Sequence, residues 1–86
     1  MSAKVEIYSS AFCGYCARAK SLLRRKGVDF VEYDVLERPE LREQMVARAG
    51  GRTSVPQIFA DGKHLGGSDD IHALDAAGKL DPILAG

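Results

Sequence analysis

Apolar and polar positions follow two periods along the first half of the chain. Residues 4–9 alternate between polar and apolar side chains, which is typical of a strand, and residues 28–35 alternate less regularly. Between them, residues 15–26 carry Ala19, Leu22 and Leu23 at the i, i+3 and i+4 positions of one helical face. The pattern predicts a strand, a helix and a second, parallel strand, joined in the right-handed sense.

The next stretch predicts a helix followed by a hairpin. Pro39 suits the first turn of a helix, and Gly50 with Gly51 ends it. The buried stripe of this helix is formed by Leu41, Met45, Val46 and Ala49. Pro56 stands directly before a short strand, and the Asp61-Gly62 pair predicts a tight turn into an antiparallel strand over residues 63–65. We interpret His64 in that strand as an exposed residue and not as a ligand.

A third helix and a terminal turn close the chain. Ser68 is the expected N-cap, and Ile71 with Leu74 marks the inward face. Leu80, Ile83 and Leu84 predict a short turn that packs back on the core. The order is therefore β-α-β-α-β-β-α, which describes an α/β fold with a four-stranded mixed sheet flanked by helices.

Length and charge exclude several classes of protein. The 86 residues predict one domain over residues 1–86. Twelve basic and twelve acidic residues cancel, so bulk charge favours neither a nucleic-acid partner nor a membrane surface. No apolar run reaches the roughly 18 residues that span a bilayer, and the N-terminal residues lack the apolar core of a signal peptide. We therefore expect a cytoplasmic protein.

Both cysteines lie in one motif, Cys13-Gly14-Tyr15-Cys16, between the first strand and the first helix. A bridge across two residues would restrict the unfolded chain little, so redox chemistry or metal binding is the better use for the pair. Structural zinc needs four ligands, and His64 and His72 lack finger-like spacing. Residues three apart at a helix start are neighbours on one face, so the two sulfurs can close a disulfide. Cys13 sits where unpaired N–H groups and the helix dipole favour a thiolate, the reactive form of cysteine.

Three motifs together resemble a known family. They are Cys13-Gly14-Tyr15-Cys16, the segment 53–59 (Thr-Ser-Val-Pro-Gln-Ile-Phe) and the segment 66–70 (Gly-Gly-Ser-Asp-Asp). Their order and spacing resemble the thioredoxin fold and, within it, the glutaredoxins over nearly the whole chain. Thioredoxins proper look less similar, since they usually place Trp before the first cysteine, where this chain has Phe12.

The resemblance implies a glutathione-dependent oxidoreductase. Cys13 would attack a glutathione mixed disulfide, and Cys16 or a second glutathione would resolve it. Val55 would pair its backbone with the tripeptide as edge augmentation, and Pro56 would be cis. Ser68 and Asp69 would take the γ-glutamyl end, and Tyr15 and Thr53 would complete the glutathione site. The implied partners are glutathione, glutathionylated or disulfide-containing proteins and, indirectly, glutathione reductase with NADPH, for a protein that we expect to be a monomer.

Each motif also has a simpler interpretation, and two departures from the family leave a second function open. Ser68 and Asp69 could only cap a helix, Pro56 could be an ordinary trans proline, and Tyr15 could only pack. Gly14 stands where many glutaredoxins have proline. Relatives without that proline include proteins that share a [2Fe-2S] cluster between two subunits, through the first cysteine and glutathione, so Cys13 would be the metal ligand in that alternative. Ser10 stands where relatives often have a lysine, a cation that Arg18, Arg48 or Arg52 could replace.

Overall fold

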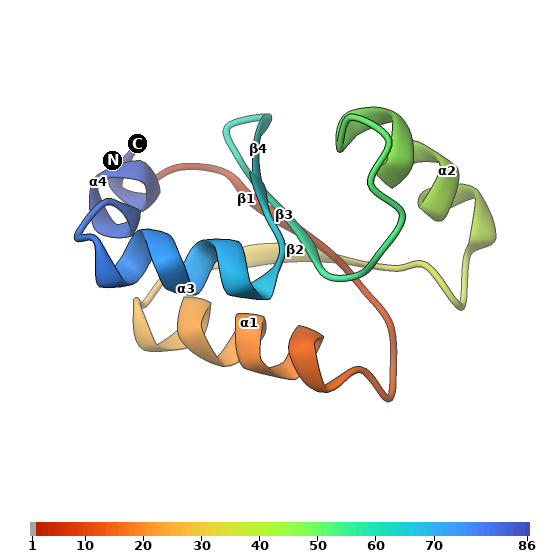
Figure 1. Cartoon of the computed structure of the whole chain (residues 1–86), viewed down its shortest axis with the longest axis horizontal. Helices are drawn as coiled ribbons and strands as arrows, with labels where there is room; N and C mark the ends of the chain where they lie inside the picture. The colour runs from red at the N-terminus through yellow and green to blue at the C-terminus, as the bar shows by residue number, and fades with distance from the viewer. Residues whose placement is uncertain (1) are drawn as a thin grey trace.

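The computed structural model describes residues 2–86, which form four strands and four helices (Figure 1). The strands are β1 (Val5–Ser9), β2 (Phe30–Asp34), β3 (Gln57–Ala60) and β4 (Lys63–Gly66). The helices are α1 (Gly14–Arg25), α2 (Pro39–Arg48), α3 (Ser68–Ala76) and α4 (Leu80–Ala85). The predicted order of elements is confirmed, and the expected terminal turn is the short helix α4.

The strands form one mixed sheet in the order β2-β1-β3-β4. β1 pairs with β2 in parallel and with β3 antiparallel, and β3 pairs antiparallel with β4. The C-terminal end of β1 therefore lies beside the N-terminal end of β3, with Tyr8 opposite Gln57. We call this end of the strands the site edge of the sheet. β4 ends at the same edge, because Gly66 lies opposite Ile58.

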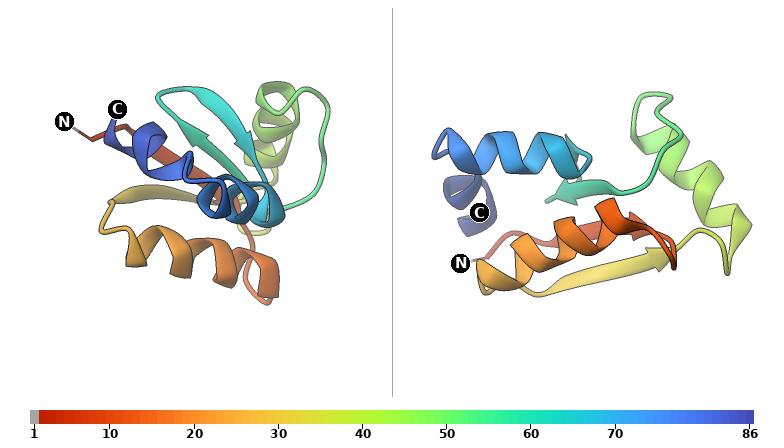
Figure 2. Two further views of the ribbon diagram at one scale, coloured as in Figure 1. Left: turned by 60° about the vertical axis from the view of Figure 1, so that its left-hand side comes forward. Right: turned by 60° about the horizontal axis from the view of Figure 1, so that its bottom comes forward.

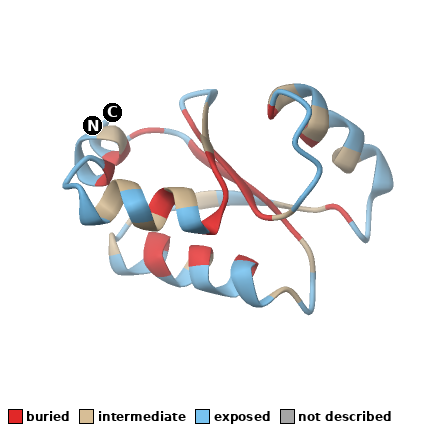
Figure 3. Cartoon of the chain, in the orientation of Figure 1, coloured by how far each residue is buried: buried red, intermediate tan, exposed pale blue. Residues whose placement is uncertain are grey.

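Helices cover both faces of the sheet (Figures 1 and 2). On one face α1 and α3 lie side by side, and with α4 they bury the larger apolar cluster, which includes Ile7, Leu23, Ile58 and Ile71. On the other face α2 lies alone over a smaller cluster around Tyr8, Met45 and Phe59. The central strands are thus buried on both sides, as the red segments of Figure 3 show.

The start of α3 corrects one prediction. Ser68 is not the N-cap: Gly67 takes that position, and Ser68 is the first helical residue, 4% exposed. The carboxylate of Asp70 satisfies the end of the helix by accepting a hydrogen bond from the Gly67 backbone N–H at 2.8 Å. A glycine fits here because a side chain at position 67 would press against the Pro56 carbonyl oxygen.

Across residues 2–86, no helix combines the length and the apolar character needed to cross a bilayer.

Candidate active site

Three segments meet at the edge of the sheet where β1 and β4 end and β3 begins. The loop after β1 carries Cys13, the Val55-Pro56 peptide precedes β3, and Gly67 follows β4. The Val55-Pro56 bond is cis, as the resemblance implied. Antiparallel pairing thus gathers the three sequence motifs at one place, although residues 17–65 lie between the first motif and the last.

Cys13 lies at the N-terminus of α1 and is half-buried. It is the N-cap residue, with an extended backbone, and its Sγ accepts a hydrogen bond from the backbone N–H of Cys16 at 3.1 Å. The first N–H groups of a helix have no acceptor within the helix, and the Cys13 sulfur accepts from one of them. The sulfur also lies at the positive end of the helix dipole. Cys13 is thus the more accessible of the two cysteines and lies at the helix end that favours an anion.

Cys16 lies one turn further along α1 and is only 1% exposed. Burial is the main cause, and the hydrogen-bonding interaction with Cys13 the second, that raises the pKa of the Cys16 thiol to about 12. Cys16 is therefore protonated at neutral pH. Both cysteines are free in this structure, so it describes the reduced pair. Because Cys13 is less buried than Cys16, Cys13 is the thiol that a substrate can reach from solvent, and Cys16 is the buried second thiol.

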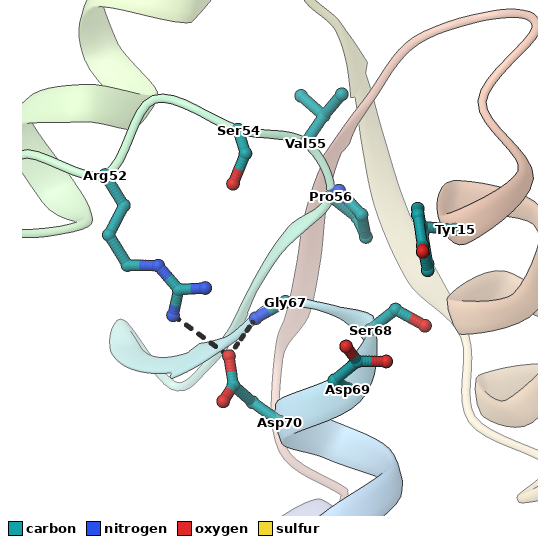
Figure 4. A pocket seen from close by; sticks show the side chains of 9 residues that line it. All are labelled: Tyr15, Arg52, Ser54, Val55, Pro56, Gly67, Ser68, Asp69 and Asp70. Carbon is teal, nitrogen blue, oxygen red and sulfur yellow. Dashed lines mark hydrogen bonds and ion pairs between the residues drawn. The ribbon is translucent and has the colours of Figure 1, made fainter.

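A groove of about 350 Å³ opens beside this helix end (Figure 4). Tyr15 from α1 borders it on one side, and the loop before β3 and the first turn of α3 complete it. The volume lies within the range of roughly 300–1,000 Å³ that small-molecule sites occupy. The full lining is Tyr15, Arg52, Ser54, Val55, Pro56, Gly67, Ser68, Asp69 and Asp70.

Charged groups of both signs line the groove. Arg52 donates to the Asp70 carboxylate at 2.9 Å, and the same oxygen accepts from the Gly67 N–H (Figure 4). The Gly67 N–H and, second, Arg52 hold the pKa of Asp70 below its usual range. Asp69 is exposed in the first turn of α3. The groove thus offers a guanidinium, a free carboxylate and a helix N-terminus to a zwitterionic ligand.

The structure gathers five of the predicted glutathione residues around the groove: Tyr15, Val55, Pro56, Ser68 and Asp69. Thr53 lies outside the lining, and its carbonyl accepts a hydrogen bond from Arg42 at 2.6 Å. Of the three candidate replacement cations only Arg52 lines the groove, whereas Arg48 pairs with Glu6 under α2.

Sequence reasoning did not assign Ser54, Gly67 or Asp70 to the groove. The signal for Asp70 was its place three residues after Gly67, which is the spacing of a carboxylate that closes a helix N-terminus.

The interpretation of His64 as an exposed residue is wrong. Its ring is half-buried against Phe59, with ring centroids 5.0 Å apart, and its Nε2 lies 2.6 Å from the Gln57 side-chain oxygen. Burial lowers the pKa of His64, so the ring is neutral at physiological pH.

A CxxC pair at the start of a helix, facing a cis-proline loop across the edge of a mixed sheet, defines a thiol–disulfide oxidoreductase of the thioredoxin fold. The family model named Glutaredoxin matches residues 5–65. The chain belongs to the glutaredoxin family.

Individual relatives agree with this assignment. A probable glutaredoxin of Synechocystis is 58% identical over 98% of this chain and 96% of its own. The solution structure of a glutaredoxin from Brucella melitensis superposes with a TM-score of 0.85 at 50% identity, covering 98% of this chain and 90% of that one. A crystal structure of a buckwheat glutaredoxin–glutathione complex has a TM-score of 0.87 at 28% identity, with 95% and 76% covered.

Proposed function

We propose that this protein reduces glutathione mixed disulfides and protein disulfides, with glutathione as the reductant. The observation that carries the proposal is the position of the groove, which begins at Tyr15, two residues after the accessible sulfur of Cys13. The buckwheat relative was solved with glutathione. The reaction needs a pool of reduced glutathione, so we also propose a reducing compartment such as the cytoplasm.

The groove offers a complementary group to each part of glutathione. We propose that the backbone of Val55 pairs with the cysteinyl residue as a short antiparallel strand. The N–H groups of Ser68 and Asp69 at the start of α3 would receive the γ-glutamyl carboxylate, and the Asp69 side chain its ammonium group. Tyr15 and Pro56 would flank the sulfur. Arg52 would face the glycine carboxylate, while Thr53 would act from outside the lining by fixing the loop.

The reaction follows from the unequal burial of the two thiols. The Cys13 thiolate attacks the glutathionyl sulfur, so that a Cys13–glutathione disulfide forms and the other thiolate leaves and takes up a proton. A second glutathione thiolate can then attack the bound glutathionyl sulfur, which releases glutathione disulfide and restores the Cys13 thiolate. Alternatively, Cys16 loses its proton and attacks the Cys13 sulfur, which releases glutathione and leaves a Cys13–Cys16 disulfide. Two further glutathione molecules reduce that disulfide and leave as glutathione disulfide.

A coupled assay tests the proposal. The wild-type protein is given the mixed disulfide of glutathione and 2-mercaptoethanol, with glutathione, glutathione reductase and NADPH, and oxidation of NADPH is followed. We expect saturable, protein-dependent turnover. In a second assay without the reductase, loss of the mixed disulfide is followed by chromatography, with either glutathione or an equal concentration of a small monothiol as the reductant. The protein-dependent rate should be much lower with the monothiol, because the groove does not hold it. Equal rates with both thiols would contradict glutathione dependence.

Phe12, directly before the nucleophile, points to contact with protein substrates. Its side chain is fully exposed and its backbone φ is 61°, in the left-handed region that is unfavourable for a bulky residue. A partner's cysteine must come within bonding distance of the Cys13 sulfur, about 2.05 Å, so residues beside that cysteine must pass Phe12. We propose that the Phe12 ring packs on this part of a protein substrate.

The variant Phe12→Asn tests this contact. Asparagine tolerates the left-handed backbone but lacks the ring. Because burying such a ring contributes roughly 1.5–3 kcal/mol, we expect KM for a protein disulfide to rise at least about tenfold. KM for the small mixed disulfide should stay at the wild-type value. An equal change for both substrates would show that Phe12 acts on the cysteine loop and not on the partner.

A second candidate function is carriage of a [2Fe-2S] cluster, which Gly14 motivates. A cluster needs four ligands, and residues 2–86 contain no group of three or more Cys, His, Asp or Glu side chains placed to hold a metal ion. One chain therefore does not fit a cluster by itself, and two chains would each have to contribute Cys13 and a bound glutathione. Anaerobic reconstitution with iron, sulfide and glutathione tests this: a coloured dimer supports it, and a colourless monomer contradicts it.

A further inference from the structure

A short chain of hydrogen bonds runs from β4 to the loop that borders the groove. His64 Nε2 lies 2.6 Å from Gln57 Oε1, and Gln57 Nε2 donates to the Ser54 carbonyl at 3.0 Å and to the Ser54 hydroxyl at 3.4 Å. Gln57 is completely buried. Ser54 and its neighbour Val55 line the groove, whereas His64 and Gln57 do not. The chain thus connects residues outside the site to the backbone of the site.

The direction of each hydrogen bond in this chain is fixed by chemistry. A carbonyl oxygen only accepts, so the Gln57 amide must turn its NH₂ group toward Ser54. Its Oε1 then faces His64 and can only accept, so the neutral imidazole must carry its proton on Nε2. His64 therefore donates to the side-chain oxygen of Gln57, and the side-chain NH₂ group of Gln57 donates to the Ser54 carbonyl.

Pairing in the β3–β4 ladder places His64 beside Gln57. The register shifts between Ile58 and Phe59, so that Phe59 pairs with His64 while Ile58 pairs with Gly66. Here the His64 ring stacks on Phe59 and reaches diagonally to Gln57, which lies two residues earlier on the same face of β3. The ring is thus held in position by packing as well as by its hydrogen bond.

We propose that His64 is a positioning residue for glutathione, acting through Gln57 on the Ser54-Val55 backbone. The inference rests on the proposed function, since it concerns the same groove. A peptide ligand that pairs with Val55 needs the N–H and C=O of that residue held in a fixed direction. The Ser54 carbonyl belongs to the peptide unit that supplies the Val55 N–H. Fixing this carbonyl through Gln57 therefore fixes the donor that the tripeptide would meet.

Because of where His64 lies, its loss should affect the binding of glutathione and not the reactivity of Cys13. The residue belongs to β4, so it has no place in the cysteine loop or in α1, and its loss should leave the reactivity of Cys13 unchanged. A looser Ser54-Val55 peptide should weaken binding of the glutathionyl group before the sulfur reacts. The signature is a raised KM with an unchanged kcat.

The experiment compares His64→Phe with wild type in the mixed-disulfide assay. Phenylalanine keeps the stacking on Phe59 but has no N–H for Gln57. Because one hydrogen bond is lost, we expect KM for the mixed disulfide to rise about fivefold while kcat stays unchanged. The rate at which iodoacetamide alkylates the reduced protein should also stay unchanged, since it reports on the Cys13 sulfur alone. Gln57→Met, which removes the hydrogen bonds to His64 and to Ser54, should raise KM at least as much and provides an independent second variant.

Two controls separate positioning from loss of stability. His64→Gln retains an N–H donor and should bring KM back to within about twofold of wild type. Val5→Ala removes buried apolar volume at the opposite end of β1 and should lower the melting temperature without changing KM.

The outcomes also separate this inference from the function on which it rests. Absence of turnover in the wild-type protein would overturn the proposed function. Wild-type turnover with an unchanged KM in both His64→Phe and Gln57→Met would overturn the positioning role alone. The same KM increase in Val5→Ala would overturn it too, because stability would then explain the effect.

Discussion

Replacing Cys13 by serine is expected to abolish reduction of both glutathione mixed disulfides and protein disulfides. Replacing Cys16 by serine is expected to impair only the reduction of protein disulfides. Cys13 is the accessible sulfur, and a serine hydroxyl cannot form its mixed disulfide, so Cys13→Ser should lower every rate by at least about a thousandfold. Cys16→Ser should keep turnover of the small glutathione mixed disulfide, because a second glutathione can resolve the intermediate. Its reduction of protein disulfides should fall at least about a hundredfold, since the resolving thiol is lost from its adjacent position.

Steady-state rates of the two variants on both substrates check this prediction. Melting temperatures close to wild type would show that both variants are folded. Retained turnover in Cys13→Ser would mean that the buried Cys16 can act as the nucleophile, against the burial that raises its pKa to about 12. Equal loss of both activities in Cys16→Ser would mean that glutathione cannot reach the mixed disulfide.

The second large effect is expected on stability, from an ion pair beneath α2. Arg48 donates from both terminal nitrogens to the Glu6 carboxylate, at 2.9 and 3.1 Å, and to the Tyr8 hydroxyl at 2.8 Å. The Tyr33 hydroxyl donates to Glu6 at 2.7 Å, and the Arg48 guanidinium lies 4.2 Å from the centre of the Phe59 ring. Glu6 is only 7% exposed. This pair joins α2 to β1.

We expect Arg48→Met to lower the free energy of unfolding by about 3 kcal/mol, because it leaves the Glu6 carboxylate buried and unpaired. The double variant Glu6→Leu/Arg48→Met should recover much of that loss, since it removes the buried charge together with its partner. Urea unfolding of the wild type and the two variants measures both differences. If Arg48→Met changed the free energy of unfolding by less than about 0.5 kcal/mol, the pair would contribute no more than an exposed surface ion pair, and the prediction would be wrong.

The same carboxylate predicts part of the pH dependence of stability. The hydrogen bonds from Arg48, with those from Tyr33, hold the pKa of Glu6 below its usual range despite burial. The unfolded chain therefore binds the proton more readily than the folded one, so stability rises with pH in the acidic range. The contribution of Glu6 is complete above about pH 5 and is lost as the pH falls through the folded pKa. Unfolding of Glu6→Gln from pH 7 down to pH 3 should show a smaller loss of stability than wild type, and an identical loss would contradict this assignment.

The elements of the fold could be predicted from the sequence because they depend on local signals, whereas the roles of the three motifs are implied by the family resemblance. Strand alternation, the helical stripe of Ala19, Leu22 and Leu23, and the Asp61-Gly62 turn each act over a few residues. The cis form of Pro56 was foreseen through the family resemblance and not through local chemistry.

The interactions that the sequence left undetermined join residues far apart in the chain. Glu6 alternates with apolar neighbours and would face solvent in a sheet covered on one face only, but α2 covers the second face and brings Arg48 to it. The sequence predicts an exposed His64 for the same reason, since nothing near it in the sequence reveals that its ring packs on Phe59 and lies beside Gln57. Ser68 failed as a cap because a carboxylate three residues after Gly67 satisfies the helix end instead.

The most direct test of the central claim is where glutathione becomes attached. The Cys16→Ser variant, reduced and then treated with glutathione disulfide, should gain one glutathione per chain, found on Cys13 by peptide mass spectrometry. Amide chemical shifts of Val55 and Asp69 should change in the adduct, because the bound tripeptide fills the groove. Failure to form the adduct, or an adduct that leaves the Val55 and Asp69 signals unchanged, would contradict a glutathione site built around Cys13.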